Sequence, residues 1–376
     1  MLLNLYDYID KYKNYTFQDK DLTDVDAMLF SFLAYANFEE ILLRSDALTI
    51  HEVARRHIIT YTKKDMDILA VRQANKLLRY IKDTKRYQDC ILSNYERIET
   101  DVVQFSAITI EYRKNHLFVA FEGTNAAFSG WIEDLLLSCE FPTMSHTLAI
   151  RYLNNHFTFS FKELIIGGHS KGGNLALVSS MYANSIVRRK IHWIYNGDGP
   201  GLLDEEYHSK RYQSILNKYT HFIPDYGVVG ILLNHDSDVI VKSKMKNILS
   251  HDVLYWEIQE DTFEKTTLSP FSKELDIEIA RWVRNTPISQ KRELITNLEI
   301  VLRTANVDSL LDLKTNYLKV FSIIFNSNKM SNSSKNTLSN FIKILLKCFD
   351  KARKEEVQLF LNHIFKKDNK ESREDD

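Results

Sequence analysis

The sequence is sparing in cysteine, proline and glycine, and it carries almost no net charge. Its three cysteines, Cys90, Cys139 and Cys348, are widely spaced and form no CxxC or Cys/His cluster, so they support neither a disulfide framework nor a zinc site. Lys and Arg number 49 against 50 Asp and Glu, which removes any bulk electrostatic reason to expect a nucleic-acid or anionic-membrane partner. No apolar run approaches the roughly 18 residues of a membrane span.

The beginning of the sequence also lacks the pattern of a secretion signal. MLLNLYDYIDKYKNYTF is interrupted by Asp7, Asp10 and several lysines, and it has no apolar core followed by small residues. We therefore expect a soluble, cytoplasmic protein. Apolar residues make up 44% of the chain and aromatic residues 12%, enough for a sizeable core. The richness in Lys, Asn and Ile suggests a bacterium with an AT-rich genome.

Glycine marks the part of the chain that is richest in turns. All 11 glycines lie between Gly123 and Gly230, where apolar strand-like and helix-like segments alternate. Strands are predicted at 104–112, 116–123, 163–167, 191–195, 220–223 and 238–242, the first two as a hairpin, and helices at 24–48, 63–87, 145–155, 171–187 and 203–219. Such alternation predicts an α/β fold with a mostly parallel sheet covered on both faces.

From about Pro270 the pattern becomes purely helical. Glycine is absent there, and Leu294, Leu298, Val301 and Leu302 recur at helical spacing. We predict four regions. These are an N-terminal helical part at 1–100, an α/β core with the catalytic site at 101–268, a helical C-terminal region at 269–365, and a charged, disordered tail at 366–376.

The segment LIIGGHSKGGNLAL contains the pattern G-x-S-x-G. A strand must turn sharply into a helix here, with Ser170 at the apex and with Gly168 and Gly172 removing side chains that would collide. The start of the helix offers N–H groups and a positive dipole end to an oxyanion. Ser170 is therefore a candidate nucleophile rather than a simple helix cap. The side chain of Lys171 is expected at the surface, with only its backbone N–H facing the site.

Several segments resemble the class 3 lipase branch of the α/β-hydrolases, namely GHSKGGNLAL, LFVAFEGT and GWIEDLLLS. The chain is more similar still to a bacterial family of unknown function related to those lipases, through DGPG, IPDYGVVGILL and SHDVLYW. The resemblance covers about residues 24–256. It implies an α/β-hydrolase fold with a serine esterase or lipase-like activity, extended here by the C-terminal helices.

The same resemblance implies an oxyanion hole formed by the backbone N–H groups of Thr124, which ends FEGT, and Lys171. Class 3 lipases usually carry Arg where this chain has Glu122. GWIEDLLLS matches their lid, in which Trp131 would gate an acyl pocket. A helix packing its apolar face on the domain is an equally open interpretation of that segment.

The acid of a catalytic triad should follow the serine and precede the histidine in this fold. Asp225 in IPDYG resembles the position of the acid in class 3 lipases, and we predict it as the acid. Asp198 in DGPG is the alternative, since it also ends a strand. Asp236 and Asp238 are interpreted as caps of the turn before the next strand.

Twelve histidines compete for the role of base. His251 in SHDVLYW lies in a loop after the last predicted strand, where these folds place the base. His235 lies too close to the acid's strand, and His169 faces away from the apex of the turn. We predict His251.

Together these residues predict a serine hydrolase that cleaves acyl esters or lipids through Ser170, His251 and Asp225. No cofactor or metal is expected, and no nucleic acid. The alternative is a weak or inactive hydrolase fold that acts as a binding or scaffold protein. In either case the C-terminal helices could bind a partner or a second copy.

Overall fold

The structure of the chain is a computed structural model. It describes residues 2–42, 47–60, 69–100, 103–124, 136–306, 319–324, 326–327, 330–331 and 334–340. The chain divides into two compact units, Met1–Arg284 and Asn285–Asp376, and each is described by itself.

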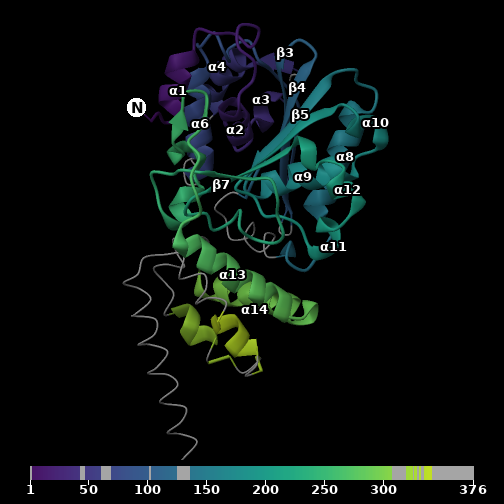
Figure 1. The fold of residues 1–376 in the computed structure, drawn as a ribbon, viewed down its shortest axis with the longest axis vertical. Helices are drawn as coiled ribbons and strands as arrows, with labels where there is room; N and C mark the ends of the chain where they lie inside the picture. The colour runs from purple at the N-terminus through teal and green to yellow at the C-terminus, as the bar shows by residue number, and fades with distance from the viewer. Residues whose placement is uncertain are drawn as a thin grey trace, which may run out of the picture. The chain divides into compact units, whose positions relative to one another are not determined.

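An eight-stranded sheet organises the first unit (Figure 1). Its strand order follows the order of the strands in the chain. The strands are β1 (Ala47–Thr49), β2 (Ile91–Glu99), β3 (Gln104–Arg113), β4 (His116–Phe121), β5 (Glu163–His169), β6 (Ile191–Gly197), β7 (Tyr219–Pro224) and β8 (Asp238–Val241). Strands β1 to β4 pair antiparallel, and β4 to β8 pair parallel. A small hairpin of β9 (Ile258–Gln259) and β10 (Thr262–Phe263) forms a separate two-stranded sheet, and the chain after β10 is joined to β8 by an isolated bridge between Lys265 and Val241.

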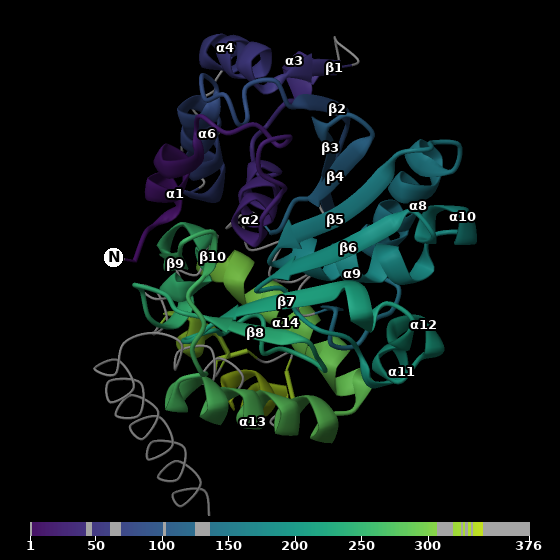
Figure 2. The ribbon, with the colours of Figure 1, turned by 45° about the horizontal axis from the view of Figure 1, so that its top comes forward.

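Helices cover both faces of the sheet. They are α1 (Leu5–Tyr12), α2 (Asp24–Leu33), α3 (Glu39–Leu42), α4 (Ile50–Thr60), α6 (Leu69–Ile81), α8 (Met144–Phe157), α9 (Lys171–Tyr182), α10 (Ser185–Arg188), α11 (Asp204–Tyr207), α12 (Lys210–Gln213) and α13 (Pro270–Asn285). Figure 2 shows α1, α2 and α6 on one side and α8, α9 and α10 on the other. The predicted α/β fold, a mostly parallel sheet covered by helices on both faces, is therefore confirmed.

Strand β4 illustrates why the sheet needs two covered faces. Its side chains alternate between the two apolar cores, with Leu117, Val119 and Phe121 on the side of α8 and α9, and Phe118 and Ala120 on the side of α2. All five are buried. A run that is apolar at every position can be buried in this way only within a sheet sandwiched between helices.

A buried ion pair anchors α2. Arg86 and Asp26 are fully buried partners, and Arg86 Nε also donates to Asp26 Oδ1 at 3.0 Å. Tyr87 and Tyr8 donate their hydroxyls to the same carboxylate, at 2.6 and 3.1 Å. Thr23 caps the helix through Asp26 N–H. Because every lone pair of the buried carboxylate is used, the charge is tolerated inside the core.

Several expectations from the sequence differ from the structure. The single helix predicted at 24–48 is wrong, because α2 ends at Leu33 and is followed by the short α3 and by strand β1. The hairpin of β3 and β4 is confirmed, but the single helix expected at 203–219 is wrong. Short helices α11 and α12 and a 3₁₀ turn, Leu216–Lys218, replace it. The break has a local cause, since Ser209 Oγ accepts from Tyr212 N–H and begins a new helix. Strand β2 was not predicted.

In the second unit the described residues include α14 (Ile288–Ala305). Its buried side chains are Lys291, Leu294, Ile295, Leu298, Val301, Leu302 and Ala305, which include the predicted apolar stripe. The helix ends at Asn306, whose left-handed φ of 55° closes the last turn. None of the helices in the described part of the chain has both the length and the apolar character that a bilayer crossing needs.

Candidate active site

Ser170 sits at the junction between β5 and α9. Its backbone has φ 59° and ψ −133°, a strained conformation for a residue with a side chain. A Cβ at Gly168 would lie 2.2 Å from the carbonyl atoms of Gly172, so the turn closes only with glycine at that position. Ser170 makes no side-chain capping hydrogen bond to α9. The strained backbone and the lack of a side-chain capping hydrogen bond distinguish Ser170 from an ordinary helix cap.

The end of β4 packs directly on this turn. A Cβ at Gly123 would lie 2.4 Å from His169 O, and one at Gly172 would lie 2.1 Å from Phe121 O. Thr124 follows Gly123 immediately and is half-buried. The chain order and these close approaches bring the FEGT segment beside the elbow. The segment 125–135, with the predicted lid residue Trp131, lies outside the described residues.

Lys171 corrects one expectation. Its side chain is buried, not exposed, with 1% of the residue's surface accessible. Nζ donates to Gln104 O at 2.7 Å. As the first residue of α9, Lys171 reaches back to the start of β3 instead of following the helix surface. The neighbouring Glu122 is also buried and meets Arg97 at 3.5 Å. Burial raises the pKa of Glu122 to about 7, against the lowering effect of Arg97 and Lys171.

Asp198 is the carboxylate that meets the predicted base. His251 Nδ1 donates to Asp198 Oδ2 at 2.6 Å, and Gly230 N donates to Asp198 Oδ1 at 2.8 Å. Asp198 is fully buried. It follows the last residue of β6, and β6 pairs parallel with β5, so Asp198 and Ser170 lie at the carboxyl ends of neighbouring strands. A Cβ at Gly230 would lie 2.4 Å from Asp198 Oδ1, which makes glycine necessary there.

Asp225, the predicted acid, lies one strand further away, at the end of β7. Its Oδ1 accepts from Tyr226 N–H at 3.1 Å and Ser243 N–H at 3.2 Å. These two hydrogen bonds link the Asp225 carboxylate to the backbone that follows β7 and to the backbone that follows β8. Neither of them joins it to His251.

His251 is held in place through its own backbone. It ends a 3₁₀ helix, Asn247–His251, and its carbonyl oxygen accepts from His169 Nε2 at 2.7 Å. The two imidazole rings lie 4.4 Å apart between centroids. His169 Nδ1 in turn contacts Tyr35 OH at 2.9 Å. Trp256, fully buried, donates Nε1 to the preceding carbonyl, that of Ser250, at 2.8 Å. These contacts fix the loop that carries the predicted base.

Charge in this site is controlled by burial. Burial raises the pKa of Asp198, while hydrogen bonds such as that from Gly230 N–H favour its ionised form. Burial lowers the pKa of His251, with the charge of Asp252 acting in the opposite direction. Burial likewise lowers the pKa of His169 to about 3. Both imidazoles are therefore neutral at pH 7, the state that a general base requires.

Sequence comparison identifies the family. The model of the Mbeg1-like family matches residues 81–299, more than half of the chain. The chain belongs to the Mbeg1-like family. The matched range of this Mbeg1-like chain includes Ser170, Asp198 and His251. Among curated proteins, none matches it significantly.

Two solved lipases are remote structural neighbours of this Mbeg1-like chain. M37 lipase has a TM-score of 0.34 and 16% sequence identity, over 57% of this chain and 71% of the lipase. A complex of Rhizomucor miehei lipase with its propeptide has a TM-score of 0.36 and 12% identity, over 64% of this chain and 73% of the other.

Proposed function

We propose that the chain is a serine hydrolase that cleaves carboxylic esters through Ser170, His251 and Asp198. The observation that supports this most strongly is the 2.6 Å hydrogen bond from His251 Nδ1 to a fully buried carboxylate. A hydrogen bond of this kind fixes the imidazole tautomer whose Nε2 can accept a proton. The strained, uncapped Ser170 supplies the hydroxyl. Asp198 thus takes the role first predicted for Asp225.

In the proposed reaction, Ser170 Oγ attacks the ester carbonyl while its proton passes to His251 Nε2. The carbonyl π electrons move to oxygen, and the tetrahedral oxyanion accepts hydrogen bonds from the backbone N–H groups of Thr124 and Lys171. Collapse of this intermediate expels the alcohol, which takes the proton from His251. Asp198 stabilises the imidazolium during both steps. Water then attacks the acyl-enzyme by the same route and releases the acid.

The substrate proposed is a small acyl ester or lipid. Gly123, which packs against the elbow, and Thr124 bring a backbone segment beside the serine, as an acyl oxygen would require. Every catalytic group in this scheme is a side chain or backbone amide of the chain itself.

The test is covalent labelling of the full chain with a fluorophosphonate probe, which reacts with activated serines. We expect stoichiometric labelling of the natural protein and none of Ser170→Ala. Hydrolysis of p-nitrophenyl esters of graded acyl length then reports the preferred acyl group. A protein that is folded but neither labelled nor hydrolytic would overturn the proposal and favour a binding role for the same fold.

A further inference from the structure

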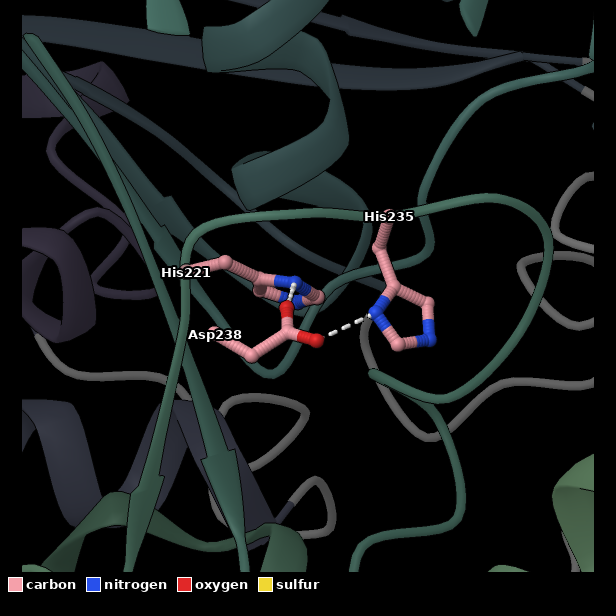
Figure 3. A group of neighbouring side chains, drawn as sticks. All are labelled: His221, His235 and Asp238. Carbon is pink, nitrogen blue, oxygen red and sulfur yellow. Dashed lines mark hydrogen bonds and ion pairs between the residues drawn. The ribbon is translucent and has the colours of Figure 1, made fainter. Parts of the chain in front are cut away.

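A second group of titratable side chains lies apart from the proposed triad. His221 belongs to β7, Asp238 begins β8, and His235 lies in the loop between them. His221 Nδ1 is 2.8 Å from Asp238 Oδ1, and His235 Nδ1 is 2.6 Å from Asp238 Oδ2. Figure 3 shows both rings turned toward the same carboxylate. One ligand atom from each residue lies within 4.8 Å of the others.

The contacts of His221 require a cation. Its side chain is fully buried, and its second nitrogen, Nε2, lies 3.0 Å from Gly199 O. Both ring nitrogens therefore face acceptors, but a neutral imidazole has only one N–H. If Nε2 donates to Gly199 O, the Nδ1 lone pair would point at a carboxylate oxygen with nothing between them. Either a second proton or a metal ion must stand there.

We propose that His221, His235 and Asp238 form a Zn²⁺ site. Two imidazoles and a carboxylate are a ligand set that suits this ion. The hydrogen bond from His221 Nε2 to Gly199 O is the outer contact that orients a metal-bound imidazole.

Bonds of about 2.0–2.1 Å in a tetrahedral site place ligand atoms about 3.3 Å apart. The nitrogen–oxygen contacts of 2.8 and 2.6 Å would therefore lengthen by roughly half an ångström, and the ligand nitrogens of the two rings, which now lie within 4.8 Å of each other, would take up the same spacing. A water completes the coordination, because the side chains of His235 and Asp238 are 14% and 25% exposed.

The surroundings favour a cation and suggest what it would do. The charges of Asp236 and Asp276 act on His235, so further negative charge lies close to the site. The ion would tie β7 and β8 to Gly199, which follows Asp198 directly. The loop from β7 to β8 also carries Gly230, whose N–H holds Asp198 Oδ1. Zinc would thus stabilise both segments that frame Asp198, as a structural site independent of the proposed hydrolysis.

The test is calorimetric titration of the EDTA-treated, dialysed full chain with Zn²⁺, together with its thermal unfolding temperature. We expect one zinc per chain and a higher unfolding temperature with zinc. Binding of Co²⁺ should give the visible absorption of four-coordinate cobalt. His235→Ala removes a partly exposed ligand, and Asp238→Asn keeps the shape but removes the charge. Each should weaken zinc binding at least about tenfold, as loss of even an outer contact does.

His208→Ala is the matched control. His208 is an exposed histidine near one carboxylate, Asp204 at 3.6 Å, and its loss should leave zinc binding unchanged. Absence of zinc binding by the natural chain would overturn the proposal in favour of a protonated His221. Binding that persists in both His235→Ala and Asp238→Asn would also overturn it, since the metal would then lie elsewhere. Unfolding temperatures in EDTA establish that each variant is folded.

Discussion

Replacing Asp198 by Asn should show which of two carboxylates, Asp198 at the end of β6 or Asp225 at the end of β7, supports the proposed hydrolysis. The change is isosteric, and the structure dictates how the amide must turn. Gly230 N–H is a fixed donor to Oδ1, so the amide oxygen takes that position. The amide NH₂ group then faces His251 Nδ1, which must become an acceptor. That forces the proton onto Nε2, the nitrogen that should take the proton of Ser170.

The expected loss is large because the wrong tautomer cannot act as a base. The corresponding change in a serine protease triad lowers kcat about 10⁴-fold, and we expect roughly 10³–10⁴ here. Asp225→Asn is the matched control. Both backbone donors to Asp225 meet Oδ1, so an amide oxygen can replace it, and activity should stay within about threefold. Steady-state hydrolysis of a p-nitrophenyl ester measures both variants. The opposite ranking, with Asp225→Asn inactive and Asp198→Asn active, would refute the assignment.

Three further predictions follow from burial. Burial lowers the pKa of His251 and raises that of its partner Asp198, so uptake of one proton by this pair should remove activity and kcat/KM should fall through a single ionisation as the pH is lowered; a profile that falls through two separate ionisations, or that does not fall at all, would contradict this. Tyr35→Phe leaves the buried His169 Nδ1 without its hydroxyl partner and should cost about 1–3 kcal/mol in urea unfolding, whereas an unchanged midpoint would disprove the role of this contact. Arg86→Met leaves the buried Asp26 charge unpaired and should cost about 3–5 kcal/mol; a loss below about 1 kcal/mol in the same assay would be inconsistent with it.

The elbow could be predicted from the sequence because its determinants are local. Glycines on both sides of Ser170, a strand before it and a helix after it lie within one short segment. Strand β2 could not be predicted in the same way. Its alternation is interrupted by a register shift between Ser93 and Glu96, with Asn94 at φ 51°. A bulge moves successive side chains off the period of two on which a strand prediction depends.

The choice between Asp198 and Asp225 as the partner of His251 could be made only from the three-dimensional structure. Both follow parallel strands, and both precede His251 in the chain, so order and spacing fit either one. What distinguishes them is where the loop after β7 returns to deliver Gly230 N–H, and where His169 holds the carbonyl of His251. Lys171 is similar, since its burial depends on the distant carbonyl of Gln104. The glycine of VVGILL is Gly230, whose N–H meets Asp198, and that contact could be recognised only with the structure.

The two outer strands of the large sheet have a consequence for aggregation. β1 is only three residues long, and β8 is four. The free side of β8 is partly occupied, because Thr266 N–H donates to Ile240 O at 2.9 Å and Lys242 N–H donates to Glu264 O at 2.9 Å. Because both edge strands are short and β8 is also partly paired, they offer another chain few backbone groups for hydrogen bonding. The sheet therefore has little scope for growth into an intermolecular ribbon through its two borders.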